Sequence, residues 1–160
     1  MLSYEESYLG QLRQLVGNRT LIGVGARAVI QDKQERILLV QRSDNGMWVM
    51  PAGSIELGES ILDCLKREVR EETGLEVLAA TPIALYSEPR FAFTNAYGAH
   101  FQMFALVFRV DVWSGTLQTE TNETSAARFF AFDELPADMP DVLLETLEDV
   151  QKYTGQFIVK

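Results

Sequence analysis

The stretch that decides the fold is Gly53-Ser-Ile-Glu-Leu-Gly-Glu-Ser-Ile-Leu-Asp-Cys-Leu-Lys-Arg-Glu-Val-Arg-Glu-Glu-Thr-Gly-Leu75. Its glycine-rich first third, which follows a proline, predicts a loop. From Ser60 onward, apolar residues recur at helical spacing and predict a helix of about four turns, at Ile61, Leu62, Leu65 and Val69. Ser60 with Asp63 predicts the amino-terminal cap, and Gly74 predicts a left-handed exit at the carboxyl end.

The polar face of this helix carries an unusual concentration of acid. Glu68, Glu71 and Glu72 are three and four residues apart, so they share one flank, where like charges repel. The helix dipole also disfavours anions near the carboxyl end. Carboxylates gathered in this way, with Glu59 approaching from the loop, are oxygen ligands of the kind that Mg²⁺ or Mn²⁺ prefers. The alternative is a solvated charged face, but its electrostatic cost favours the metal site.

The same residues fit every fixed position of the Nudix box, G-x5-E-x7-R-E-U-x-E-E-x-G-U, in which U is a bulky aliphatic residue. The matching positions are Gly53, Glu59, Arg67, Glu68, Val69, Glu71, Glu72, Gly74 and Leu75. The flanks 36–42, 48–53 and 123–136 also resemble those of small MutT-like Nudix hydrolases. The resemblance implies an α/β protein with the Nudix fold, an α/β/α sandwich built on a mixed β-sheet.

Composition is consistent with one soluble globular domain. The chain has 160 residues, of which 47% are apolar and 23% charged. We expect a cytoplasmic protein, because the sequence shows no leader or membrane-spanning pattern and one cysteine suits a reducing compartment. The net charge of −9 argues against binding to duplex nucleic acid. It is compatible with a small nucleotide substrate if divalent cations bridge the two anions.

Along the chain, we expect an N-terminal helix within residues 1–18 and a Nudix domain over residues 19–160. The helix, at 3–16, is amphipathic and either packs on its own domain or forms the contact of a homodimer. Strands at 20–31 and 36–42 are predicted to form a hairpin. The remaining predicted elements are a helix at 60–73, strands at 76–87, 101–112 and 128–132, and a helix at 140–153.

The resemblance also implies roles for the residues of the box. Glu68, Glu71 and Glu72 would hold the metal, and Glu71 and Glu72 would be catalytic through it. Glu59 would contribute directly or through water, and the carbonyl group of Gly53 is a further possible ligand. Bound metal would orient and activate the attacking water.

Arg67, the remaining polar residue of the box, is expected to point away from the metal flank. We expect it to orient the ligands through an ion pair with Glu59 or Glu71. A general base is expected outside the helix. Glu123, in a loop before the last strand, is the first candidate, and Glu120 is the alternative. A simply solvated glutamate is the other interpretation of either residue.

Substrate contacts are expected from two further places. Arg42 ends a strand near the site and either meets phosphate or forms a surface ion pair. Arg90, Phe91 and Tyr97, in the loop 87–97, either contact base, ribose and phosphate or pack as a lid. The predicted function is metal-dependent hydrolysis of the pyrophosphate bond in a nucleoside diphosphate linked to another moiety, such as ADP-ribose or a nucleoside triphosphate. The alternative is a regulatory domain that binds a nucleotide or ADP-ribose without turnover.

Overall fold

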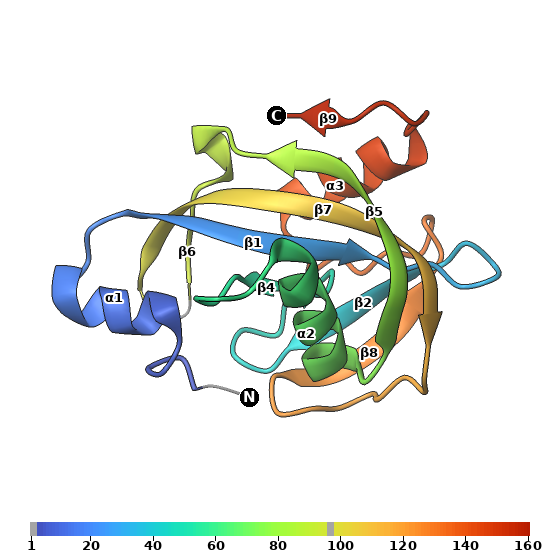
Figure 1. Ribbon diagram of the computed structural model, residues 1–160. Coiled ribbons are helices and arrows are strands. Elements are labelled where there is room, and N and C mark those ends of the chain that lie inside the picture. Colours follow the sequence, from blue (N-terminus) through green and yellow to red (C-terminus); the bar gives the residue numbers. More distant parts are fainter. Residues whose placement is uncertain (1–2, 96–97) are drawn as a thin grey trace.

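The computed structural model describes residues 3–95 and 98–160 (Figure 1). Three α-helices, one 3-10 helix and nine strands make up this part of the chain. In order they are α1 (Tyr8–Val16), β1 (Leu21–Val29), β2 (Ile37–Arg42), β3 (Trp48–Val49), β4 (Ala52–Ser54), α2 (Ile61–Thr73), β5 (Glu76–Tyr86), η1 (Pro89–Phe91), β6 (Phe93–Thr94), β7 (His100–Ser114), β8 (Thr124–Phe130), α3 (Asp141–Gln151) and β9 (Ile158–Val159).

The strands form two sheets. The larger has the order β4-β1-β7-β5-β9, with β6 added to β7. It is mixed, because β1 and β7 run parallel whereas β5 and β7 run antiparallel. The smaller sheet has the order β3-β2-β8 and is antiparallel. The mixed α/β architecture predicted from the sequence is therefore confirmed.

The predicted hairpin of strands 20–31 and 36–42 is wrong. The strands β1 and β2 lie in different sheets and meet only at a single bridge between Gln31 and Ile37. Both edges of β1 are already occupied, by β4 and β7, so β2 pairs with β3 and β8 instead. The first four residues of β2 are all buried, as expected for a strand covered on both faces. Such a continuous apolar run carries no alternation from which a partner could be chosen.

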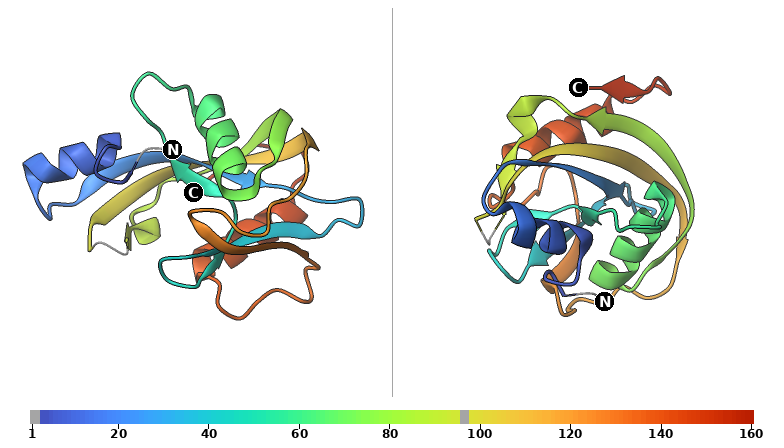
Figure 2. Two further views of the ribbon diagram at one scale, coloured as in Figure 1. Left: turned by 90° about the horizontal axis from the view of Figure 1, so that it is seen from below. Right: turned by 60° about the vertical axis from the view of Figure 1, so that its left-hand side comes forward.

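Two helices cover opposite sides of this core, as Figures 1 and 2 show. Cys64, Leu65 and Val69 of α2 are buried in one apolar cluster with residues of β1, β5 and β7. Full burial of a side chain such as Leu65 contributes about 1.5–3 kcal/mol. Leu62 is 39% exposed, so Cys64 takes its place in the predicted apolar stripe. On the other side, α3 packs through Leu143 and Leu147 into the second large cluster.

The first helix begins at Tyr8 rather than at residue 3, because Ser7 caps it. Leu9 of α1 packs with Ala99 and Phe101, so this helix contacts its own domain. A homodimer contact stays a prediction. Two strands also differ in extent, since β7 runs over 100–114 and β8 over 124–130. None of the helices in the described ranges is long and apolar enough to cross a membrane.

Candidate active site

The helix α2 is fixed at both ends by its caps. The Oγ atom of Ser60 accepts a hydrogen bond from the backbone N–H of Asp63 at 3.1 Å. At the other end, Gly74 has φ 73° and its N–H donates to the carbonyl oxygen of Arg70. Both predicted caps are therefore present. The caps fix where the helix begins and ends, and burial of Cys64, Leu65 and Val69 fixes which face turns inward, so that Glu72 reaches Ala52 of β4.

Strand β4 is the second element that holds the site. It pairs with β1, with Gly53 opposite Ala26. The backbone N–H of Ala52 donates to Oε2 of Glu72 at 2.9 Å. A Cβ atom on Gly53 would overlap the carboxyl group of Glu68. Only glycine therefore leaves room for the Glu68 side chain in its observed position.

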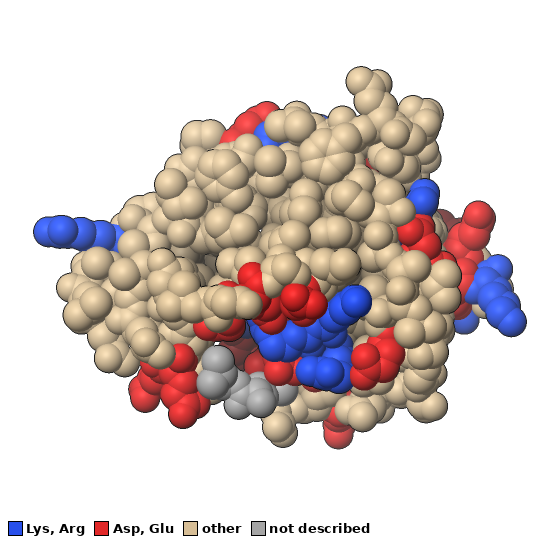
Figure 3. Space-filling model, viewed as in Figure 1, with Lys and Arg blue, Asp and Glu red and all other residues tan. Residues whose placement is uncertain are grey.

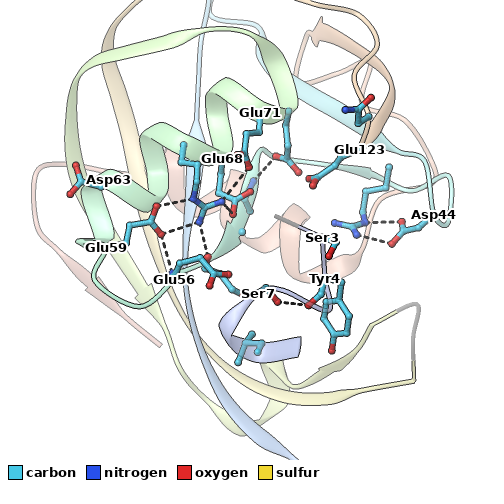
Figure 4. A pocket seen from close by; sticks show the side chains of 18 of the residues that line it. Ser3, Tyr4, Ser7, Asp44, Glu56, Glu59, Asp63, Glu68, Glu71 and Glu123 are labelled. Atoms are coloured by element: carbon cyan, nitrogen blue, oxygen red, sulfur yellow. Dashed lines mark hydrogen bonds and ion pairs between the residues drawn. The ribbon is translucent and has the colours of Figure 1, made fainter. Parts of the chain in front are cut away.

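Three carboxyl groups converge between these elements. Oxygen atoms of Glu68, Glu72 and Glu123 all lie within 4.8 Å of one another. Figure 4 shows Glu68 and Glu71 on one side of the pocket and Glu123 across from them. Glu68 and Glu72 are buried, with 8% and 3% exposure, whereas Glu123 is exposed but directs its carboxyl group into the cavity. Residues from α2 and from the segment before β8 thus meet at one point.

Burial dominates the electrostatics of this cluster. It raises the pKa of Glu68 to about 7, against the opposing effect of the adjacent Arg67. Burial and the carboxylate of Glu68 raise the pKa of Glu72 well above its ordinary value. The pKa of Glu123 is also raised, first by partial burial and then by the carboxylate of Glu71. Among the residues that the structure describes, no arginine or lysine forms an ion pair with Glu72.

Arg67 contacts Glu68 of the predicted metal flank, so the prediction that it points away from that flank is wrong. Its guanidinium group contacts Glu59 at 2.7 Å, Glu68 at 2.6 Å and Glu71 at 3.3 Å. It also donates to the carbonyl oxygen of Ser54 at 3.0 Å. The loop before α2 folds back along the helix and brings Glu59 alongside it, which helical spacing alone does not reveal. The predicted ion pairs with Glu59 and Glu71 are present.

Glu59 differs from the other carboxylates of the box. Its Oε1 and Oε2 atoms both accept hydrogen bonds from Arg67, and Oε2 also accepts from the backbone N–H of Glu56 at 3.0 Å. These contacts lower its pKa, with the Arg67 hydrogen bond as the largest cause. Glu59 therefore fixes Arg67 and lies outside the converging cluster. The carbonyl oxygen of Gly53 faces the Sγ atom of Cys64 at 3.6 Å.

The cluster opens into a cavity of about 860 Å³. Eight carboxylate and two guanidinium side chains line it, and both guanidinium groups are already engaged. Arg42 pairs with Asp44 through two contacts of 2.9 and 2.7 Å. In the view of Figure 3, which is that of Figure 1, charged side chains gather below the centre of the molecule. The surface above them carries almost none. The cavity therefore has a large excess of negative charge.

The structure brings some of the predicted substrate residues to this cavity and not others. Arg42 and Glu123 line it, whereas Glu120 does not. Arg90 and Phe91 also lie outside its lining, which corrects the expectation that they face the site. Arg90 is held by Glu145 on α3, and Phe91 is buried against a tyrosine of β5. Tyr97 lies outside the described residues.

Sequence reasoning missed a group of lining residues before α1. Ser3, Tyr4 and Ser7 line the same cavity as the carboxylates. In the sequence they read as part of the amphipathic helix, and nothing in the local pattern indicates that the segment reaches the box loop. Asp44, which holds Arg42, was also missed, although an acidic residue two positions after an arginine is a recognisable pairing signal.

Residues 21–150 match the NUDIX domain family model. The chain belongs to the Nudix family. It is 36% identical over 110 residues to the NAD-capped RNA hydrolase NudC of Vibrio vulnificus, an alignment that covers 68% of this chain and 38% of that protein. It is 32% identical over 110 residues to the ADP-ribose pyrophosphatase of Methanocaldococcus jannaschii, covering 67% of this chain and 61% of the relative. The chain thus spans less than half the length of the NudC relative that it matches.

Solved structures agree on the fold of this Nudix domain. The MutT NUDIX hydrolase from Burkholderia pseudomallei superposes with a TM-score of 0.66 at 28% identity, over 82% of this chain and 98% of that one. The MutT protein from Methanosarcina mazei gives a TM-score of 0.68 at 19% identity, over 86% of this chain and 99% of its own, and bears on the fold alone. The Nudix fold predicted from the box is therefore confirmed.

Proposed function

We propose that this Nudix protein hydrolyses the pyrophosphate bond of a nucleoside diphosphate linked to another moiety, with Mg²⁺ or Mn²⁺ as cofactor. The names of its relatives support this substrate class. Besides the NAD-capped RNA hydrolase and the ADP-ribose pyrophosphatase, they include a putative 8-oxo-dGTP diphosphatase from Bacillus subtilis that is 36% identical over 67 residues. NAD, ADP-ribose and dGTP all contain a nucleoside joined to a diphosphate unit.

The observation that carries the proposal is the converging cluster of Glu68, Glu72 and Glu123. Two of these carboxyl groups are buried, and Glu72 accepts one hydrogen bond, from Ala52, among the contacts of the described residues. Burying carboxylates without a matching cation is costly. A divalent cation fits this donor set, because all three donors are carboxylate oxygens. We expect Glu68, Glu72 and Glu123 to hold it, with Glu71 facing the same cavity.

A bound divalent ion would neutralise phosphate oxygens and lower the pKa of a water molecule. The side chains of the chain itself would do the rest. Arg67 holds the carboxylates of Glu68 and Glu71 in fixed orientations. Arg42 lines the cavity on the side of Glu123 and would bind a phosphate oxygen beside its partner Asp44.

Glu123 has a second role open to it. Burial raises the pKa of Glu123, which makes its carboxylate a better proton acceptor, as a general base requires. It comes from the segment before β8 and not from α2, so it approaches the cavity from a different direction than the box residues. Among the two loop glutamates considered from the sequence, its position favours Glu123 over Glu120.

A substrate panel tests the proposal. The purified protein is incubated with ADP-ribose, NADH, dGTP and 8-oxo-dGTP in Mg²⁺, in Mn²⁺ or in EDTA, and the products are identified by mass spectrometry. We expect cleavage between two phosphorus atoms, dependent on the metal. The same panel is run on Glu72→Gln, which removes one carboxylate of the cluster. Glu76→Gln, at an exposed site just after the helix, is its matched control. Tight nucleotide binding without any turnover would favour the regulatory alternative.

A further inference from the structure

The segment before α1 forms one wall of the cavity. Ser3, Tyr4 and Ser7 of this segment, followed by Leu9 in the first turn of α1, line it together with the carboxylates of α2. Figure 4 shows the three labelled members of this group, Ser3, Tyr4 and Ser7, on the opposite side of the pocket from Glu68 and Glu71. The segment is separated in sequence from the box by about fifty residues, so only the fold brings the two together.

Specific contacts fix this segment in place. The Oγ atom of Ser7 donates to the carbonyl oxygen of Tyr4 at 2.7 Å and accepts from the N–H of Gly10 at 3.1 Å. A Cβ atom at Gly10 would overlap that same carbonyl oxygen of Tyr4. The backbone of Tyr4 therefore lies directly against α1, in a space that only glycine provides. Because the backbone of Tyr4 is fixed in this way, the position of its Cα atom at the edge of the cavity is fixed as well.

The segment is also connected to the box through the loop before α2. The N–H of Tyr8 donates to Oε2 of Glu56 at 2.8 Å, and the N–H of Glu56 donates to Oε2 of Glu59 at 3.0 Å. Glu59 in turn holds Arg67 at 2.7 Å. A continuous series of hydrogen bonds thus runs from the first turn of α1 to the arginine that orients the carboxylates.

The chemistry of this wall differs from the rest of the cavity. Its four lining residues are uncharged and include Tyr4, the one aromatic side chain among the described residues that line the cavity, whereas the other segments contribute eight carboxylates, two guanidinium groups and seven uncharged residues. A diphosphate belongs beside the metal-binding cluster, and the aromatic ring for the nucleoside is at this wall, across the cavity from the cluster. An aromatic ring is well suited to a nucleoside, because a base stacks on it. The hydroxyl groups of Ser3 and Ser7 are already hydrogen-bonded within the segment, so the ring of Tyr4 is the group suited to this contact.

We propose that residues 3–7 recognise the nucleoside portion of the substrate and that Tyr4 is a specificity-determining contact. This inference rests on the proposed hydrolase function and deepens it. In this proposal, α1 and the turn before it contribute to the active site of the same chain. The segment precedes the region that matches the family model, which begins at residue 21.

Tyr4→Ala and Tyr8→Ala form a matched pair of variants. Both remove a tyrosine within or just before α1, but Tyr8 does not line the cavity and is 37% exposed. Steady-state kinetics are measured on the panel compound with the highest kcat/KM. We expect Tyr4→Ala to raise KM at least tenfold with kcat within about threefold of wild type. Tyr8→Ala should stay within twofold in both, and Tyr4→Phe should restore KM if stacking is the contact.

A binding measurement separates failure of this inference from failure of the proposed function. Calorimetric titration with ADP-ribose in Ca²⁺ reports affinity whether or not turnover occurs. If wild type turns over no panel compound, the hydrolase proposal fails, and a tenfold weaker affinity of Tyr4→Ala than of Tyr8→Ala still supports the wall. Equal KM or equal affinity for these two variants would overturn the inference, as would a wild-type protein that neither binds nor cleaves any compound. Gly10→Ala, which displaces Tyr4, should reproduce the Tyr4→Ala result.

Discussion

Gly53→Ala should separate activity from stability. The added methyl group would overlap the carboxyl carbon and both oxygen atoms of Glu68. These atoms are the far end of a flexible side chain, so the side chain can rotate away while the backbone of β4 stays in place. The variant therefore moves one carboxylate out of the converging cluster and leaves the strand pairing with β1 intact.

The expected size of the two effects follows from the contacts. Displacing Glu68 breaks its ion pair with Arg67, which is partly exposed and contributes about 0.2–1 kcal/mol. Replacing glycine by alanine stabilises by about 0.4–1 kcal/mol through the unfolded state. The free energy of unfolding in EDTA should thus change by less than about 1 kcal/mol. Misplacing a ligand by one rotamer should lower kcat/KM at least about 100-fold.

Gly25→Ala provides the contrast, because there the added methyl group meets backbone. It would lie 2.5 Å from the carbonyl oxygen of Gly53 and 3.4 Å from Cε of Met103. Relief requires β1 and β4 to separate, so this variant should lose about 1–3 kcal/mol of stability. Urea unfolding in EDTA and steady-state kinetics in Mg²⁺ measure both quantities. Gly53→Ala with wild-type turnover and Mg²⁺ affinity would refute the assignment of Glu68 to the cluster.

Three further predictions concern charge. Glu72→Gln should lower kcat by several orders of magnitude without unfolding the protein, and its thermal midpoint should no longer rise with Mg²⁺ as that of wild type does. Glu123→Gln should lower kcat about 10²–10⁴-fold, whereas Glu120→Gln, outside the cavity lining, should stay within twofold at saturating Mg²⁺; equal losses would remove Glu123 from the site. The guanidinium of Arg90 and the ammonium of Lys160 hold the pKa of Glu145 at about 2, below its ordinary 4.5. Their stabilisation is therefore complete above about pH 5 and lost as the pH falls toward 2. Because these groups are exposed, Glu145→Gln should cost less than about 1 kcal/mol at pH 7, and the difference from wild type in urea unfolding should shrink at pH 3.

The parts of the fold that could be predicted from the sequence are those set by local chemistry. The caps of α2 depend on Ser60 and Gly74, which act within a few residues of themselves, and both are observed. The grouping of Glu68 and Glu72 on one flank follows from helical spacing and survives in the structure. The box determines both the caps and the grouping of the carboxylates, because it spans a loop, a helix and a turn.

The parts that could not be predicted depend on contacts between distant segments. The division of β1 and β2 into separate sheets is decided by β7 and β8, which lie far along the chain. Arg90 has the composition of a phosphate contact, yet the partner that decides its position is Glu145, fifty-five residues later. The wall formed by residues 3–7 is likewise followed by Tyr8, whose backbone N–H donates to Glu56, forty-eight residues later. No local pattern encodes any of these pairings.

Two acidic clusters in this protein show opposite electrostatics, and the contrast is an argument about function. Two cations, Arg90 and Lys160, contact the carboxylate of Glu145 directly and hold its pKa at about 2, as expected where charge stabilises the fold. Around Glu68, burial outweighs the single guanidinium of Arg67 and raises the pKa to about 7. A sequence selected for stability alone would place a second cation beside Glu72. Sequences depart from the arrangement that favours stability mainly at functional sites. Here the departure is the group of buried carboxylates that faces the cavity.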